Sequence, residues 1–263
     1  MLAVLSPAKS LDLTTPVPDV AATQPVFLSD AAKLAKRAAK LKAADLRALM
    51  YISEPLAALN AARFKAFHTP FTPDNARPAL YTFHGDVYRG LDGPTLDAGT
   101  VAFAQEHVRV LSGLYGALRP LDLIQPYRLE MGIKLATARQ SDLYGYWGNR
   151  ITDALAAALA GHADRTLVNL ASVEYFGVVR PERLPAAVLT IDFRDDHDGE
   201  LKFNSFAAKR ARGLMARYMC VERVDRCSGL HDFDYEGYRF TPAASGDDHW
   251  VFARPRSDKH RRI

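Results

Sequence analysis

Three short apolar runs along the chain share one pattern. Each is rich in aliphatic and β-branched residues and ends at a serine: LAVLS at positions 2–6, VRVLS at 108–112 and TLVNLAS at 166–172. Short apolar runs of this kind are typical of strands buried on both faces of a parallel sheet. The loops that leave the carboxyl ends of such strands form the site in open α/β sheets. The pattern therefore predicts that Ser6, Ser112 and Ser172 lie along one edge of a sheet.

Helical and turn patterns fill the intervals between these runs. AVLTIDF at 187–193 predicts a further strand, and Asp-Gly within DDHDGE at 195–200 predicts a hairpin turn after it. Residues 68–78 are rich in Pro and Asn and predict a loop. The predicted helices cover 30–41 with Ser29 as N-cap, 43–51, a segment from Ser53 and Pro55 to about 67, 148–159, and 206–222 with Ser205 as N-cap.

The order of these elements predicts an α/β fold with a mixed sheet and surrounding helices. The chain has 263 residues, of which 48% are hydrophobic and 24% charged, and this composition is ordinary for a globular protein. We find no internal repeat or linker. We therefore expect one domain over residues 1–252 and a basic, flexible tail over residues 253–263.

The net charge of +4 comes from the end of the chain. Residues 253–263 hold five Lys or Arg and one Asp, which leaves 29 basic and 29 acidic residues in the remainder. Any basic surface of the body must then arise from uneven distribution of charge. The tail itself fits either a solubilising end or a contact with a polyanion.

Several functional classes lack their signatures. Cys220 and Cys227 are separated by six residues, which fits neither a redox CxxC nor a zinc knuckle, so we expect free thiols in a reducing cytoplasm. No apolar run is long enough to cross a membrane, and the first residues lack the features of a signal peptide. The eight His are scattered, no GxSxG or P-loop is present, and we expect no metal and no cofactor.

The segment LSGLYGALRPLDLIQPYRLEMG, residues 111–132, concentrates candidate chemistry. Two interpretations are open: an ion-pair network that pins a long loop, or a loop that offers Arg forks to an anion. Arg128 and Glu130 would share a face and pair if they lie in a strand. The candidates that this segment adds to the predicted cleft are Tyr115, Arg119, Asp122 and Tyr127.

Other candidates follow the remaining predicted strands. Lys9, in SPAK, is suited to a phosphate or a carbonyl, although a solvated loop lysine is the simpler alternative. GDVYRGL resembles a turn that carries Asp86 and Tyr88. Asn169 and Glu174 follow the run at 166–172.

Two predicted helices are basic. Residues 205–219 place Lys209, Arg210, Arg212 and Arg217 within an arc of about 160° on a helical wheel, opposite the apolar residues. A solvated face is one explanation, and a polyanion ligand is the sharper one. The segment ISEPLAALNAARF has the general shape of a helix-hairpin-helix, which grips DNA through backbone amides, but it lacks the usual hairpin glycines. The further DNA-binding candidates are Lys33, Lys36, Arg37, Lys40 and Arg63.

These segments together resemble the YaaA family of bacterial peroxide-stress proteins over nearly the whole chain. The resemblance rests on LSPAKSLD, LNAARF, GDVYRGL, the block at 111–132, LYGYWG, VNLASVEYF and SFAAKRARGLMARY. It implies a cytoplasmic protein that limits damage from hydrogen peroxide, is associated with less unincorporated iron, and binds DNA. It also implies a mixed α/β fold with a positively charged cleft and a helix-hairpin-helix at about Asp45–Phe67. Ala57 and Ala58 occupy the expected hairpin, where Gly would let amides approach phosphate.

Three functional hypotheses follow. The leading one is a peroxide-defence protein that binds duplex DNA without sequence specificity, with no membrane and no obligate protein partner. The alternative is an enzyme that acts on a nucleotide or nucleic acid, with Glu130 or Glu174 as general base and with Arg128 and Lys9 stabilising negative charge. The third, direct iron sequestration, is disfavoured because the His residues lack ligand spacing.

Overall fold

β1 (Leu2–Leu5) is the centre of the main sheet, and all four of its residues are buried. It pairs in parallel with β5 (Val108–Ser112) on one side and with β8 (Thr166–Leu170) on the other. The structure, a computed structural model, describes residues 1–255. The three serine-ending runs are therefore neighbouring parallel strands, as their pattern predicts, and their carboxyl ends meet at one edge of the sheet.

The main sheet has eight strands and mixed direction. Its order is β11-β12-β9-β8-β1-β5-β6, and β10 pairs with β9. The central strands β12, β9, β8, β1 and β5 are parallel, while β6, β10 and β11 are antiparallel to their neighbours. The remaining strands of this sheet are β6 (Gly116–Leu118), β9 (Ala187–His197), β10 (Glu200–Lys202), β11 (Arg239–Phe240) and β12 (His249–Pro255). Two small sheets pair β2 (Ser10–Leu11) with β4 (Phe83–His84) and β3 (Arg77–Pro78) with β7 (Leu123–Ile124).

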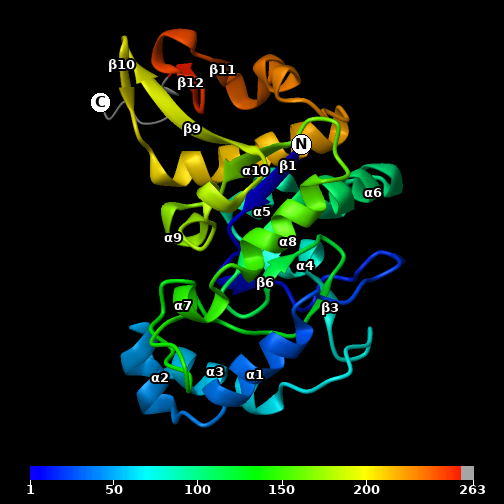
Figure 1. The fold of residues 1–263 in the computed structure, drawn as a ribbon, viewed down its shortest axis with the longest axis vertical. Coiled ribbons are helices and arrows are strands. Elements are labelled where there is room, and N and C mark those ends of the chain that lie inside the picture. Colours follow the sequence, from blue (N-terminus) through cyan, green and yellow to red (C-terminus); the bar gives the residue numbers. More distant parts are fainter. Residues whose placement is uncertain (256–263) are drawn as a thin grey trace.

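Helices flank the sheet and complete a single α/β domain, which confirms the predicted fold class. α6 and α10 pack against β1, whereas α1, α2 and α3 lie together at the far end of the long axis (Figure 1). The helices are α1 (Leu28–Ala38), α2 (Ala43–Met50), α3 (Glu54–Ala66), α4 (Ala79–Thr82), α5 (Asp86–Leu91), α6 (Ala98–His107), α7 (Leu143–Trp147), α8 (Arg150–Leu159), α9 (Val173–Phe176) and α10 (Ser205–Val221). Within residues 1–255, the connections also contain the short 3-10 helices η1 (Gly93–Thr95), η2 (Pro181–Arg183), η3 (Cys227–Asp232), η4 (Tyr235–Gly237) and η5 (Pro242–Ala244).

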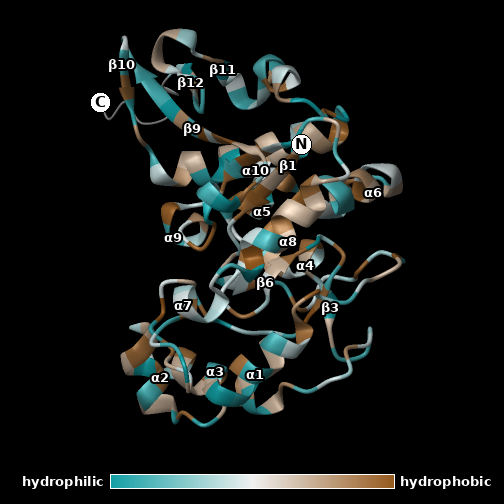
Figure 2. Cartoon of the chain, viewed as in Figure 1, coloured by the Kyte–Doolittle hydropathy of each residue, from teal (hydrophilic) through white to brown (hydrophobic). Residues whose placement is uncertain are grey.

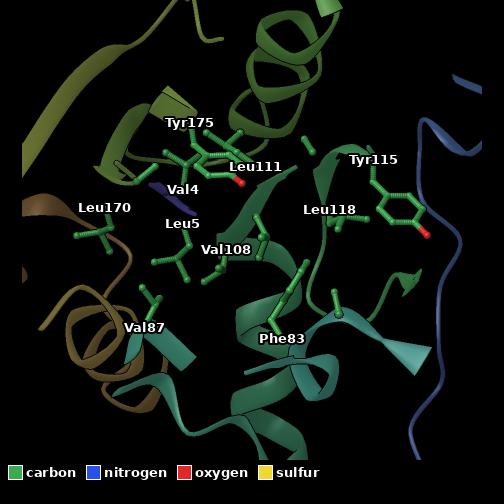
Figure 3. Packing of buried hydrophobic residues seen from close by; sticks show 14 of the residues in the cluster. Val4, Leu5, Phe83, Val87, Val108, Leu111, Tyr115, Leu118, Leu170 and Tyr175 are labelled. Atoms are coloured by element: carbon green, nitrogen blue, oxygen red, sulfur yellow. The ribbon is translucent and has the colours of Figure 1, made fainter. Parts of the chain in front are cut away.

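The core is built around β1. Val4 and Leu5 pack among side chains from β5, β8 and α5, and Figure 3 shows Leu170, Val108 and Val87 around them. In the distant helical layer, α1, α2 and α3 each carry both hydrophobic and hydrophilic residues (Figure 2). α1 is clearly amphipathic, because its apolar residues fall on one face and are buried: Ala31, Leu34, Ala35 and Ala38.

Two predicted helix caps are wrong. α1 begins one residue before Ser29, with Phe27 at the cap position, because the Phe27 ring packs edge-on against Trp147 with centroids 5.4 Å apart. α10 begins at Ser205 itself, and Asn204 caps it by accepting a hydrogen bond from the Ala207 amide. Tertiary contacts thus decide where these helices begin.

GDVYRGL forms α5 rather than the predicted turn. α5 packs backbone to backbone against α10, since a Cβ on Gly213 would lie 1.8 Å from the Val87 carbonyl oxygen. A Cβ on Gly90 would likewise lie 2.2 Å from the Arg210 carbonyl oxygen. Only glycine permits this approach. The two helices therefore hold each other, and the side chains of α10 are fixed relative to the β1 edge.

The region expected to form a helix-hairpin-helix contains α2 and α3. Tyr51, in a left-handed conformation, ends α2, and Ser53 occupies the cap position of α3. The segment ISEPLAALNAARF is mostly one continuous helix, and Ala57 and Ala58 lie inside α3 instead of at a hairpin. The two-helix arrangement is present, and its assignment as a DNA-gripping hairpin stays a prediction.

The end of the described chain extends the sheet. Residues 253–255, which we assigned to the tail, belong to β12, while residues 256–263 of the tail lie outside the described residues. The Asp-Gly hairpin after β9 is confirmed, with Asp198 and Gly199 both at positive φ. Among residues 1–255 no helix is long and apolar enough to cross a membrane.

Candidate functional site

A cavity of about 400 Å³ opens at the carboxyl edge of the parallel strands. It lies where β1 and β8 end and where α5 and α10 pack together. Several predicted candidates from distant parts of the sequence line it. They are Ser6, Lys9, Asp86, Tyr88, Ser172, Glu174, Lys209 and Arg212.

The two strand-end serines form one hydrogen-bonded unit. The Ser172 amide donates to Ser6 Oγ at 2.9 Å, and the Ser6 hydroxyl donates to Ser172 Oγ at 3.3 Å. Tyr88 adds a hydrogen bond from its hydroxyl to the Ser6 carbonyl oxygen at 3.1 Å, and its burial raises its pKa. The hydroxyl proton of Ser6 is thus committed to Ser172, whose own proton remains available for a further acceptor.

Glu130 lies beside this cavity and is buried. Its Oε1 atom accepts from Arg128 at 2.9 Å and lies 3.3 Å from the Lys9 ammonium. Its Oε2 atom is buried and has no hydrogen-bond partner in the described chain. Both Arg128 and Glu130 line a small hollow next to the cavity, together with Lys9 and Tyr175. The predicted pair is present, although residues 128–130 form extended loop and not a strand.

Two cations of α10 face the cavity. Arg212 is half-buried, burial lowers its pKa, and its Nε atom has no hydrogen-bond partner within residues 1–255. Lys209 is exposed one turn earlier, with its ammonium 5.9 Å from the centre of the Phe206 ring. These residues and Lys9 give the cavity three positive groups from two distant segments.

The acidic residues of the cavity wall are held by neighbours. Asp86 pairs with Arg89 at 3.1 Å. Glu174 accepts a hydrogen bond at 2.9 Å from the Gly132 amide, which ties the segment 111–132 to α9. Glu174 therefore joins the predicted loop to the strand-end serines.

Other predicted cleft residues are buried and form hydrogen bonds inside the protein. Ser112 bonds to the Tyr127 hydroxyl at 2.6 Å, and the Tyr115 hydroxyl donates to the Gln125 carbonyl oxygen at 3.2 Å. All three side chains are buried, and burial raises the pKa of both tyrosines. Ser112 and Tyr115 do not line the cavity, and Tyr127 reaches only the small hollow beside Glu130.

Three further candidates make structural contacts away from the cavity. Arg119 pairs with the fully buried Asp122 at 2.9 Å, and Asp122 also accepts from the Thr23 hydroxyl at 2.6 Å. Asn169 accepts from the Ala171 amide at 3.0 Å and so shapes the end of β8. For Arg119 and Asp122, the pinned-loop interpretation describes their contacts.

The predicted DNA-binding residues fall into two distant groups. On α10, Arg210 pairs with Glu236 at 2.6 Å, and Arg217 donates to the carbonyl oxygens of Leu91 and Asp92. These contacts tie α10 to its neighbours. Lys209 and Arg212 are the members of this helix that face the cavity.

The second group lies on α1, on the turn that follows it (Lys40) and on α3, far from α10 (Figure 1). Lys33 is 3.6 Å from Asp30, and Arg37 donates to the Ala136 carbonyl oxygen at 2.8 Å. Lys36 and Lys40 are exposed, whereas Arg63 is half-buried. The two basic helices therefore do not line one cleft.

Some cavity residues were not predicted. Tyr175 is mostly buried against the cavity and the Glu130 hollow, and burial raises its pKa. His84 and Ser10 reach the cavity through the short pairing of β2 with β4. Tyr175 lies within the VEY segment after β8, so its position was available from the sequence, whereas the β2–β4 pairing carried no pattern.

Both cysteines are poor peroxide-reactive groups. Burial raises the pKa of Cys220 to about 12 and that of Cys227 to about 11. Reaction of a thiol with peroxide needs the thiolate, which is scarce at neutral pH when the pKa is this high. No group of three or more His, Cys, Asp or Glu suited to a metal ion occurs among residues 1–255.

A wider hollow of about 780 Å³ lies at the opposite edge of the sheet, near His107 and His162. Burial lowers the pKa of both imidazoles. In open α/β sheets, ligands bind outside the carboxyl ends of the strands. The cavity at Ser6 and Ser172 is therefore the better candidate site.

The fold and the cavity define an α/β protein with a cationic site at the carboxyl edge of a parallel sheet. The family model for the peroxide stress protein YaaA matches residues 1–244. A UPF0246 protein of Alteromonas mediterranea is 52% identical over 97% of this chain and 98% of its own, and one of Janthinobacterium is 50% identical with the same coverage. A UPF0246 protein of Aliivibrio fischeri is 49% identical over 98% of this chain and 100% of its own. The chain therefore belongs to the YaaA (UPF0246) family of peroxide stress proteins, which confirms the resemblance found in its sequence.

Proposed function

We propose that this protein acts in peroxide defence by binding duplex DNA through its phosphate backbone, without reading base sequence. The observation that carries the proposal is the charge of the separate layer formed by α1, α2 and α3. Residues 29–67 hold eight Lys or Arg and three Asp or Glu, although residues 1–252 as a whole are balanced. A concentrated excess of positive charge on one end of a neutral body is the electrostatic footprint of a polyanion ligand.

The arrangement of this layer supports a backbone contact. Lys36 and Lys65 line a hollow of about 340 Å³ between α1 and α3. Lys33 shares Asp30 with Arg150, which lies only 2.6 Å from that carboxylate, so Asp30 neutralises little of the Lys33 charge. Flexible exposed lysines suit contacts to phosphate, which position a protein on DNA and carry no sequence information.

The proposal gives a protective role in the cytoplasm, where unpaired thiols are the rule. Both cysteines are free in the structure, and their raised pKa values argue against direct reduction of peroxide by this chain. Protein bound along DNA would limit the damage that unincorporated iron and peroxide cause there. This role fits the family of peroxide stress proteins to which the chain belongs.

Charge reversal on α1 tests the proposal. The triple variant Lys33→Glu, Lys36→Glu, Lys40→Glu should bind a labelled duplex at least about tenfold more weakly in fluorescence anisotropy, because three phosphate contacts become repulsive. Arg239→Glu is the control, since Arg239 is exposed on β11, outside the α1–α3 layer, and its side chain contacts only nearby residues of its own segment, Asp234 and Tyr238, in the described chain. Unchanged affinity of the triple variant would refute a DNA contact through α1.

A second candidate function is an enzyme that acts on a nucleotide or nucleic acid. It is favoured by Glu130, whose Oε2 atom is buried without a partner while Lys9 and Arg128 hold Oε1. A carboxylate oriented in this way can act as a general base, and the two cations can stabilise negative charge that develops nearby.

Glu130→Gln separates the two candidates because it preserves the shape of the side chain and removes its basicity. If the protein is an enzyme, this variant should fail to restore peroxide survival to bacteria that lack their own copy, while its affinity for duplex DNA stays unchanged. Glu182→Gln, at an exposed position of η2, is the control. Full survival with Glu130→Gln would remove the catalytic role of this carboxylate.

A further inference from the structure

We propose that the cavity between Ser6, Ser172 and α10 binds a phosphomonoester, meaning a terminal phosphate carried by a nucleoside or by the end of a nucleic acid chain. This site is separate from the α1–α3 layer that we propose for the DNA backbone. The inference depends on the charges, the uncommitted donors and the size of the cavity.

Charge around the cavity is positive when the residues that line it or the small hollow beside it are counted together with their ion-pair partners. The basic residues that line it or pair with its acids are Lys9, Arg89, Arg128, Lys209 and Arg212. The acids are Asp86, Glu130 and Glu174. Five positive and three negative groups leave an excess of two charges, and a phosphomonoester carries a charge of about −2 above its second pKa of about 6.

Arg212 is the strongest single indication of an anionic ligand. Its guanidinium is half-buried, its Nε has no partner in the described chain, and burial lowers its pKa. Desolvating a guanidinium without a partner is unfavourable, and proteins rarely leave such a group unpaired. Asp192 acts on it only through its charge, because Asp192 itself accepts from Arg194 at 2.6 Å. A ligand phosphate would supply the missing acceptor.

Ser172 offers a second uncommitted donor. The Ser6 hydroxyl donates a hydrogen bond to Ser172 Oγ and accepts one from the Ser172 amide. These two hydrogen bonds fix the position of the Ser172 hydroxyl and leave its proton without an acceptor in the described chain. Its proton can point into the cavity. Phosphate oxygens accept several strong hydrogen bonds from such groups and from cationic side chains.

The size of the cavity fits one nucleotide and excludes a duplex. Its volume of about 400 Å³ lies within the range of about 300–1,000 Å³ that holds small ligands. Phe206, one turn before Lys209, is 72% exposed, and its ring contacts the Lys209 ammonium. Phe206 does not line the cavity itself, but an exposed ring one turn from Lys209 offers a base of a bound nucleotide a surface on which to stack.

Calorimetry with inorganic phosphate, thymidine 5′-monophosphate and thymidine tests the proposal. The two phosphates should bind and thymidine should not. Arg212→Met should weaken monophosphate binding about tenfold to a hundredfold, because a charged hydrogen bond is lost. It should not lower the thermal stability, since it removes a buried group that has no partner. Arg239→Met serves as the control for loss of one arginine.

Lys209→Met provides a second test at an exposed position, where the substitution should leave the fold unchanged. It should also weaken monophosphate binding without changing stability. Duplexes with a 5′-phosphate or a 5′-hydroxyl identify the source of the phosphate: a preference for the phosphorylated duplex indicates nucleic acid ends, and equal affinity indicates free nucleotides. Absence of phosphate binding, equal binding of thymidine, or unchanged affinity in both variants would overturn the proposal, whatever the fate of the α1 experiment.

Discussion

The ion-pair cluster at Glu130 places a carboxylate in a buried position. The Glu130 side chain is 8% exposed and that of Arg128 is 18% exposed, while the third member, Lys9, is 65% exposed. A buried carboxylate is tolerated only if nearby cations and donors compensate its lost hydration. Arg128 is therefore the main partner, and Lys9 is free to turn toward a ligand.

Arg128→Ala should lower the free energy of unfolding by about 3 kcal/mol, because it leaves Glu130 buried with one exposed partner. Urea denaturation measures this loss. The double variant Arg128→Leu, Glu130→Gln should recover most of it, since it removes both charges. Arg239→Ala, which breaks an exposed pair, should cost less than about 1 kcal/mol. Equal losses in the single and double variants would show that packing, and not charge, holds this cluster.

His162 gives the protein a predictable sensitivity to acid. Burial lowers its pKa to about 4, and the charges of Met1, His107 and Arg109 act in the same direction. Between pH 6.5 and about 4, His162 is therefore protonated in the unfolded chain but neutral in the folded chain. Stability should fall as the pH drops through this window. His162→Gln should make the fall shallower in urea melts at stepped pH, and an identical slope would contradict this.

At the scale of single residues, the sequence predicted which groups meet at the sheet edge and missed what each one does there. Ser6 and Ser172 follow from strand patterns, because strand direction brings their ends together. Arg212 and Arg217 both belong to the basic arc of the helical wheel, yet Arg217 donates to the carbonyl oxygens of Leu91 and Asp92 while Arg212 faces the cavity. That difference depends on how α10 packs, which no local pattern contains.

The pairing of α5 with α10 positions the cavity wall at the scale of elements. Gly213→Ala should lower the free energy of unfolding by about 3 kcal/mol or more, because its Cβ would lie 1.8 Å from a backbone oxygen that cannot move away alone. Gly161→Ala is the control, since nothing lies within 4 Å of its Cβ, and it should change stability by less than about 1 kcal/mol. Both effects are read from thermal or urea unfolding. A neutral Gly213→Ala would show that these helices can separate.

Element types were more predictable than element boundaries. β1, β5, β8 and β9 were recognisable because buried parallel strands need unbroken apolar runs. The predicted starts of α1 and α10 were wrong because tertiary contacts at Phe27 and Asn204 influence where these helices begin. The segment that forms α5 was predicted as a turn because its helix is stabilised by packing against α10, which is distant in the sequence. The Asn204 side-chain amide also donates to Asp195 on β9 at 3.0 Å, so the capping residue is held by the sheet as well as by the helix.

At the scale of the whole molecule, positive charge is divided between two places. The α1–α3 layer carries its excess on exposed lysines, whereas the cavity carries its excess partly buried at the sheet edge. Exposed charges suit a long polyanion that slides, and enclosed charges suit a small anion that is held. The two proposals therefore assign different ligands to different places: loosely held DNA to the α1–α3 layer, and a tightly held terminal phosphate to the cavity.

Salt dependence distinguishes these two sites in a single protein. The logarithm of the duplex binding constant should fall linearly with the logarithm of salt concentration, with a slope of about −0.9 per phosphate contacted. The Lys33→Glu, Lys36→Glu, Lys40→Glu variant should make that slope shallower by about 3, because three contacts are lost. Arg212→Met should leave the slope for a 5′-hydroxyl duplex unchanged, since Arg212 is not part of the α1–α3 layer. Anisotropy titrations from low to physiological salt measure both slopes. If Arg212→Met flattens the slope as much as the α1 variant does, the two basic regions act on the same DNA and form one binding surface.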